Sequence, residues 1–116
     1  TVTWINDLRY TETGELRTTH ALPVDTCLHG PDMTGEVPVT VVHVHGANVA
    51  SDSDGHPDHS FPPGQQSTVY TYPNNQPAAT IWYHDHALGI TRLNVYMGMA
   101  AFSTCGTSTS SAMWRW

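Results

Sequence analysis

Two runs rich in β-branched and aromatic residues, each ending in a His-x-His pair, constrain this 116-residue chain more than any other feature. The run at residues 37–46 carries His43 and His45, and the run at residues 79–86 ends in His84 and His86. Because alternate residues of a strand point to the same face, each pair should project both imidazoles together. A rise of about 3.3 Å per residue places the rings of a pair roughly 6–7 Å apart. This spacing favours two neighbouring metal ions, each taking one His from each pair.

The metal interpretation has simpler alternatives. A single His-x-His pair is more often two satisfied surface or core side chains, but two pairs on two predicted strands are far more specific. Imidazole suits zinc, copper, iron and nickel, and the lack of a carboxylate on the His face argues against an iron facial triad. Asp85 should point away from that face, either supporting an imidazole or the next loop, or facing solvent. A zinc hydrolase with Asp54 or Asp85 as its base stays open on chemistry alone.

Short strands separated by turn residues predict a single all-β domain, a sandwich or a barrel. The remaining elements are expected as strands at residues 1–5, 67–72 and 95–102 (the last one buried), and as a short helical turn at residues 87–94.

The stretches between these elements are predicted to be loops. Residues 10–37 should be mostly irregular, and the polar loop at residues 48–64 has a length that usually serves a function. We divide the chain into a domain at residues 1–102 and a Ser/Thr-rich, poorly ordered tail at residues 103–116. Because the sequence starts at Thr1, it indicates a processed or excised piece.

Composition excludes several classes of function. The net charge is −6, Lys is absent and the four Arg are scattered, so nucleic acid binding has no electrostatic basis. Apolar runs are too short to cross a membrane. Cys27 and Cys105 allow either one disulfide, which would suit a secreted or cell-envelope location, or two buried thiols. Of the eight His, His20 and His29 are expected at the surface.

The two His-x-His segments resemble the first two copper motifs of multicopper oxidases. Residues 41–46 and 81–87 carry this likeness, and residues 53–58 resemble a loop of the spore-coat laccase and phenoxazinone synthase branch. Residues 22–25 and 91–98 fit the same branch. The resemblance covers about residues 1–102, the N-terminal cupredoxin domain of that family. It implies a Greek-key β-barrel or sandwich, here lacking the first strands.

The resemblance also implies roles for individual residues. His43 matches a ligand of the type 2 copper, and His45, His84 and His86 match ligands of the type 3 copper pair. Asp54 matches an acidic residue that helps deliver protons for oxygen reduction. Its simpler interpretation is a turn-forming Asp before a glycine. His56 and His59 have no role in the family, and they could bind an extra ion or simply face solvent.

The chain departs from the family pattern in ways that shape the expected function. The motifs His-x-x-His-x-His and His-Cys-His, which supply the other cluster ligands and the type 1 copper site, do not occur. We therefore expect a laccase-type oxidoreductase that uses dioxygen and small aromatic substrates, phenols or amines, without a type 1 copper. A homo-oligomer would share the copper site and complete the barrel. The alternative is a copper-binding or storage module, or an inactive fragment of a larger oxidase.

Overall fold

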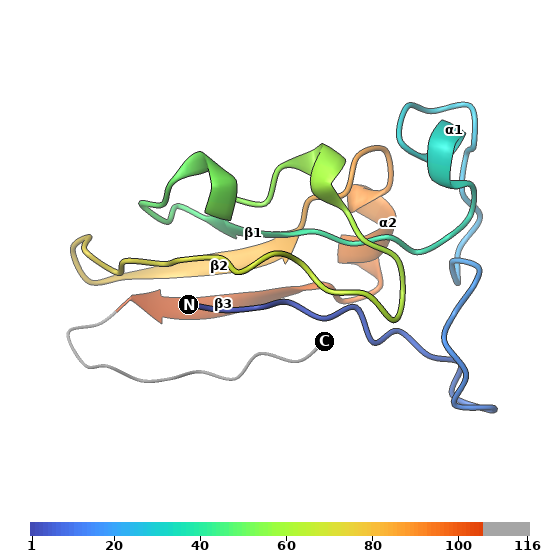
Figure 1. The fold of residues 1–116 in the computed structure, drawn as a ribbon, viewed down its shortest axis with the longest axis horizontal. Helices are drawn as coiled ribbons and strands as arrows, with labels where there is room; N and C mark the ends of the chain where they lie inside the picture. Colours follow the sequence, from blue (N-terminus) through green and yellow to red (C-terminus); the bar gives the residue numbers. More distant parts are fainter. Residues whose placement is uncertain (106–116) are drawn as a thin grey trace.

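The structure, a computed structural model, describes residues 1–105, and a three-stranded antiparallel sheet forms its centre. The strands are β1 (Val42–His45), β2 (Ala79–Asp85) and β3 (Ala100–Cys105), with β2 in the middle (Figure 1). β1 and β2 are the two segments predicted from the His-x-His pairs. Their register places His43 opposite His84 and His45 opposite Trp82. The two pairs therefore lie side by side on neighbouring strands.

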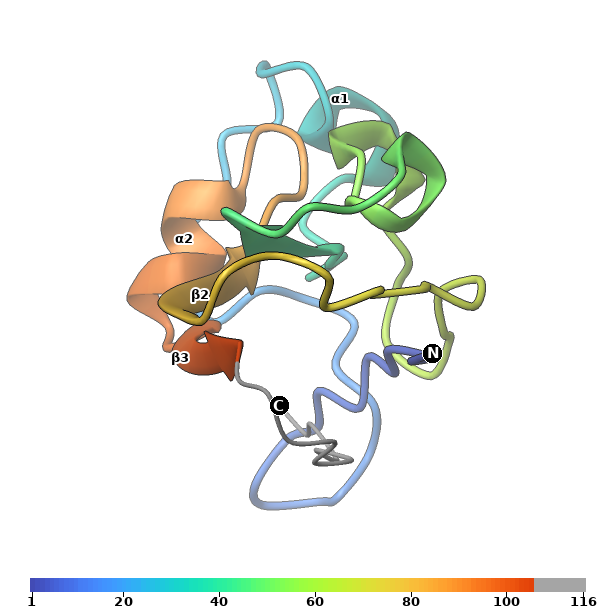
Figure 2. The same cartoon turned by 90° about the vertical axis from the view of Figure 1, so that its left-hand side faces the viewer.

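A second layer, made by the N-terminal residues and the segment around residues 66–70, lies against one face of the sheet. Figure 2 shows the N-terminal residues to one side of the three strands, as a separate layer. The layer is held by isolated bridges between Val2 and Tyr70 and between Ile5 and Gln66. Buried hydrophobic side chains fill the space between the layers: Trp4, Val42, Phe61, Tyr70 and Tyr83. The sandwich arrangement predicted from the sequence is thus confirmed.

A second hydrophobic cluster lies where β1 begins. Val41 and Val42 are adjacent and fully buried, yet they belong to different clusters because successive residues of an extended chain face opposite ways. The members of the second cluster are Val39, Val41, Ala87, Ile90 and Leu93. Both sides of the chain are therefore anchored immediately before His43.

Four short helices complete the described part of the chain. They are α1 (Pro31–Thr34), η1 (Ser51–Ser53), η2 (Pro57–His59) and α2 (Thr91–Tyr96). The single-turn helices η1 and η2 lie inside the long loop at residues 48–64. No helix among the described residues is long and apolar enough to span a membrane.

The expected strands at residues 1–5 and 67–72 are not regular strands. The two segments do run antiparallel, with Val2 and Tyr70 exchanging backbone hydrogen bonds of 2.8 Å. The ladder is broken because the amide of Trp4 donates to the side-chain oxygen of Ser67 at 3.0 Å rather than to a carbonyl. Pattern and propensity indicated the extended conformation correctly, but a side chain took the place of a ladder hydrogen bond.

The prediction of a buried strand at residues 95–102 is wrong in two respects. Val95 and Tyr96 end helix α2, which starts later than the turn predicted at residues 87–94. Gly98, with a φ of 102°, then redirects the chain into β3. Phe102 is 80% exposed, so this strand is not buried. β3 continues past residue 102 to Cys105, while the domain boundary at residue 102 stays a prediction and the tail from residue 106 lies outside the described residues.

Candidate metal centre

The four predicted imidazoles gather on one face of the sheet. On β1, Val42 and Val44 contact the core between the layers, so His43 and His45 face the other way. On β2, Tyr83 faces the core and His84 faces the same side as His43. His86 follows β2 directly, and its amide donates to the carbonyl of Val41 at 2.8 Å, which continues the pairing by one residue.

The rings converge more closely than the strand rise alone predicts. The centroids of His43 and His45 lie 5.6 Å apart, and those of His84 and His86 lie 5.8 Å apart. Across the strands, His43 lies 5.1 Å from His86 and His45 lies 5.6 Å from His84. His43, His45 and His84 each have one ring nitrogen that lies within 4.8 Å of the corresponding nitrogens of the other two. The sequence-based expectation of roughly 6–7 Å omitted the inward rotation of the rings.

Backbone carbonyls set the tautomers of two of these rings. Nδ1 of His43 donates to the carbonyl of Asp54 at 2.7 Å, and Nδ1 of His84 donates to the carbonyl of Asp85 at 2.7 Å. A carbonyl only accepts, so both rings carry their proton on Nδ1. In the neutral ring Nε2 then carries a lone pair, as a metal ligand requires.

The distance between ring nitrogens of His45 and His84 matches the distance expected for two ligands of one metal ion. Nδ1 of His45 lies 3.4 Å from Nε2 of His84. Two imidazole nitrogens that bind one ion, each about 2 Å from it, lie about this far apart when the angle at the ion is near tetrahedral. The donor set of imidazoles also suits copper.

His86 carries an unusual buried nitrogen. Its Nδ1 has no hydrogen-bond partner among the described residues, although buried polar atoms are almost always paired. Burial, helped by the nearby His43 and His84 rings, lowers the pKa of His86, which favours the neutral ring. A buried imidazole nitrogen without a hydrogen-bond partner, in a ring next to other imidazoles, is suited to bind a metal ion.

Asp85 lies behind this face and is fully buried. Its carboxylate accepts from the hydroxyl of Thr40 at 2.7 Å and from the amides of Val41 at 3.2 Å and Ala87 at 3.0 Å. Burial raises the pKa of Asp85, and these hydrogen bonds oppose the rise. Of the roles considered, anchoring the loop is observed and solvation is not. The carboxylate joins the start of β1 to the turn that follows His86. Because it accepts from the amide of Val41, that amide is not available for pairing with the neighbouring strand, and β1 begins at Val42.

Asp54 lies beside His43 at the edge of this face. Its side chain is about half exposed, with Oδ1 3.2 Å from Nδ1 of His43. Asp54 ends η1 and precedes Gly55, so the turn interpretation describes its backbone correctly. Gly55 has a φ of 79°, and a Cβ there would overlap the carbonyl oxygen of Val42. This close approach brings the carbonyl of Asp54 to His43.

Trp82 covers the exposed end of the imidazole group and was not assigned a role from the sequence. Its ring stacks on His45 at 5.1 Å and lies 4.2 Å from the ring of His84. The strand alternation that predicted His84 and His86 could also have found Trp82, two residues earlier on the same face. Phe102, opposite Trp82 in the register of β2 and β3, extends this face.

The remaining His and Cys side chains lie outside this group. His29, His56 and His59 are exposed, in accordance with the expectation. His20 is half-buried, and its Nε2 lies 3.0 Å from Oδ1 of Asn94, so the expectation of a surface role was wrong. Cys27 is an exposed free thiol rather than a buried one, and the Cys105 side chain lies outside the described residues.

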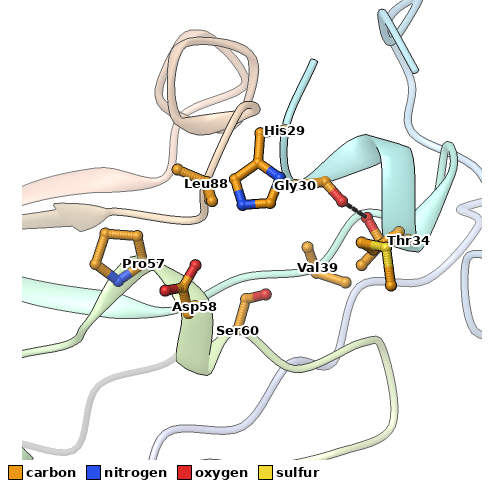
Figure 3. A pocket seen from close by; sticks show the side chains of 9 residues that line it. His29, Gly30, Thr34, Val39, Pro57, Asp58, Ser60 and Leu88 are labelled. Atoms are coloured by element: carbon orange, nitrogen blue, oxygen red, sulfur yellow. Dashed lines mark hydrogen bonds between the residues drawn. The ribbon is translucent and has the colours of Figure 1, made fainter. Parts of the chain in front are cut away.

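A small cavity of about 170 Å³ opens between α1, η2 and Leu88, and none of the four imidazoles lines it. Figure 3 shows His29 and Leu88 on one side of it and Pro57, Asp58 and Ser60 on the other. The cavity mixes apolar and polar side chains. The imidazole face, rather than this cavity, concentrates the chemistry of the chain.

Comparison with known proteins agrees with the fold and the imidazole group. Residues 37–105 match a family model described as multicopper oxidase. A laccase from Bacillus subtilis (strain 168) is 43% identical over 107 residues, covering 84% of this chain and 19% of that protein. A laccase from Bacillus stratosphericus is 46% identical over 90 residues, covering 72% and 18%. Multicopper oxidase LPR1 homolog 3 from Oryza sativa subsp. japonica is 47% identical over 109 residues, covering 86% and 19%.

An all-β sandwich with a group of His side chains that could hold a metal ion is a cupredoxin-like arrangement. The chain belongs to the multicopper oxidase family, with its laccase branch among the relatives, and the predicted cupredoxin-like fold is confirmed. The chain spans about a fifth of the length of these curated relatives.

Proposed function

We propose that this chain supplies a copper site to a laccase-type oxidoreductase, with His43, His45, His84 and His86 as ligands. The convergence of these four rings, with the proton of His43 and of His84 held on Nδ1 by a carbonyl, is the observation that carries the proposal. The carbonyls fix ring orientation before an ion arrives, which lowers the entropic cost of binding. The cluster is of the type 2 and type 3 kind, in which His43 serves type 2 and the others serve type 3.

Bound copper would supply the one-electron chemistry that couples oxidation of a phenol or aromatic amine to reduction of dioxygen to water. The chain itself contributes positioning and proton handling. Asp54, half exposed and 3.2 Å from His43, is the group placed to pass protons between solvent and this face. Trp82 excludes water from one side of His84 by lying over its ring.

Four imidazoles are too few for a complete cluster, so the remaining ligands come from outside the chain. We propose a second copy of the chain as their source, since a symmetric pair would bring eight imidazoles together. The face that holds His45, Trp82 and Phe102 is the exposed one and is the surface we expect the partner to cover. Electrons would enter without a type 1 copper.

Replacing His84 by Ala tests the proposal. Because Nε2 of His84 lies closest to a second ring nitrogen, this variant should lose bound copper and oxygen uptake with a phenol together. Copper is measured by inductively coupled plasma mass spectrometry, which also separates copper from zinc. His29→Ala, an exposed imidazole elsewhere, is the control and should keep both. Unchanged copper in His84→Ala would contradict the assignment of ligands.

The alternative is a copper-binding module, for storage or as a part of a larger oxidase. The same four imidazoles support this second candidate, because holding copper requires neither a substrate site nor dioxygen. Stoichiometric copper without any oxygen uptake would distinguish it from the enzyme.

A further inference from the structure

The long loop at residues 48–64 presents two imidazoles that are not part of the proposed copper face, by which we mean His43, His45, His84 and His86. His56 directly precedes the single turn η2 and His59 is its last residue, and both are exposed. In a 3₁₀ turn, residues three apart eclipse each other, so their side chains leave the turn in the same direction. Their ring centroids lie 5.3 Å apart with 44° between the planes.

This separation suits two imidazoles that share one ion. Each nitrogen would lie about 2 Å from the ion, which places the ring centroids about 5 Å apart at angles near 90–110°. A third side-chain ligand does not gather with the pair in the described part of the chain, so water would complete the coordination. Nickel, copper and zinc all accept imidazole nitrogen, and divalent ions of this group keep water ligands readily.

Asp58 supports the first imidazole from the same turn. Nδ1 of His56 lies 3.4 Å from the amide of Asp58 and 3.7 Å from its Oδ2. In this arrangement Nδ1 accepts from the amide, so an ion at Nε2 requires the other tautomer, in which the proton moves to Nδ1 and faces the nearby carboxylate of Asp58. A carboxylate behind a metal-binding imidazole fixes its tautomer and strengthens it as a ligand. Figure 3 shows the side chain of Asp58 beside Pro57 on the same turn.

The charge of the loop also favours a cation. Residues 51–59 contain Asp52, Asp54 and Asp58 and no Lys or Arg. Clustered negative charge raises the local concentration of cations and speeds their arrival. We propose that His56 and His59 form a second, surface-exposed site for a divalent transition-metal ion, separate from the copper face.

The site can be tested with Ni²⁺ as the probe, on the full chain at a pH where imidazole is neutral. Substoichiometric paramagnetic Ni²⁺ should broaden the amide signals of residues 56–60 in a ¹H–¹⁵N spectrum. Signals of residues 43–45 and 84–86 report the copper face separately, so failure of one site is read independently of the other. Absence of broadening at residues 56–60 in the wild-type chain would overturn the proposal.

Matched variants establish which groups bind the ion. His59→Ala leaves the contact between His56 and Asp58 in place but removes the chelate, so Ni²⁺ affinity at this site should fall about 100-fold. His56→Asn keeps a side chain that caps a helical turn and should cause a similar loss. His29→Ala should bind like the wild type. Equal affinity in wild type and His59→Ala would refute the shared site.

Discussion

The two ends of the imidazole face differ in how they are supported. At one end, His84 is buried, His43 and His86 are half-buried, and carbonyls, Asp85 and two hydrophobic clusters surround them. At the other end, His45 is exposed and contacts only other rings of this face among the interactions described, beside an exposed Trp82.

The difference separates what the chain organises alone from what a partner would have to complete. We call the end with His43, His84 and His86 the supported end, and the end with His45 and Trp82 the open end. Backbone groups and buried contacts orient the rings at the supported end whether or not an ion is present. At the open end, aromatic surface continues onto Phe102, and this surface would lose water contact only in an assembly. Changes at the supported end should therefore lower stability, and changes at the open end should alter assembly.

The largest effect is expected from Asp85→Ala. The buried carboxylate accepts hydrogen bonds from the Thr40 hydroxyl and from two backbone amides, so its loss leaves these donors without this partner. The free energy of unfolding should fall by about 3 kcal/mol, measured by urea denaturation. Glu36→Ala removes an exposed carboxylate and should change it by less than about 0.5 kcal/mol. Equal stabilities of the two variants would show that the supported end does not depend on Asp85.

A smaller loss of stability is expected from Gly55→Ala. The new Cβ would overlap the carbonyl of Val42 and would impose a left-handed φ on Ala, at a combined cost of about 2 kcal/mol. Displacing the loop should also weaken the contact between Asp54 and His43, so copper retention should fall. Gly14→Ala has a similar φ of 73° but no atoms within 4 Å of the new Cβ.

Gly14→Ala isolates the backbone strain, so it should cost about 1 kcal/mol and leave copper retention unchanged. Thermal unfolding and metal analysis of both glycine variants make the comparison. If Gly14→Ala lost copper as well, the close approach at Gly55 would not be the cause.

The sequence predicted the grouping of the four imidazoles better than it predicted the rest of the fold. Strand alternation placed His43 with His45 and His84 with His86, since both segments have the β-branched and aromatic residues of a strand. The sequence indicated loop anchoring as one of several roles for Asp85 but could not decide among them, because the contact with Thr40 joins residues 45 positions apart. The same limit applies to Gly55, where a Cβ is excluded by the carbonyl of Val42 on a distant part of the sequence.

Local pattern also misjudged where hydrophobic side chains lie. Residues 95–102 look like a buried strand by composition, yet Tyr96 is 79% exposed and Phe102 is 80% exposed. Burial depends on which surfaces the other elements cover, and composition alone does not contain that information. Among the described residues, no other element covers these two side chains.

The smallest effect on stability is expected from Phe102→Ser at the open end. An exposed side chain on β3 contributes little, so the unfolding free energy of the separated chain should change by less than about 0.5 kcal/mol. If a second copy covers this face, the mass in solution should shift toward the monomer, as measured by analytical ultracentrifugation. Val69→Ser, 63% exposed in the other layer, should not shift it. An unchanged mass in both variants would place the partner elsewhere.

Copper content per chain, measured together with the mass in solution, tests the central claim most directly. A chain loaded with copper and then dialysed should retain the metal in stoichiometric amount, and a variant with both His43 and His84 replaced by Ala should retain none at this face. A loaded wild-type chain without copper, or a variant that holds as much copper as the wild type, would contradict the account.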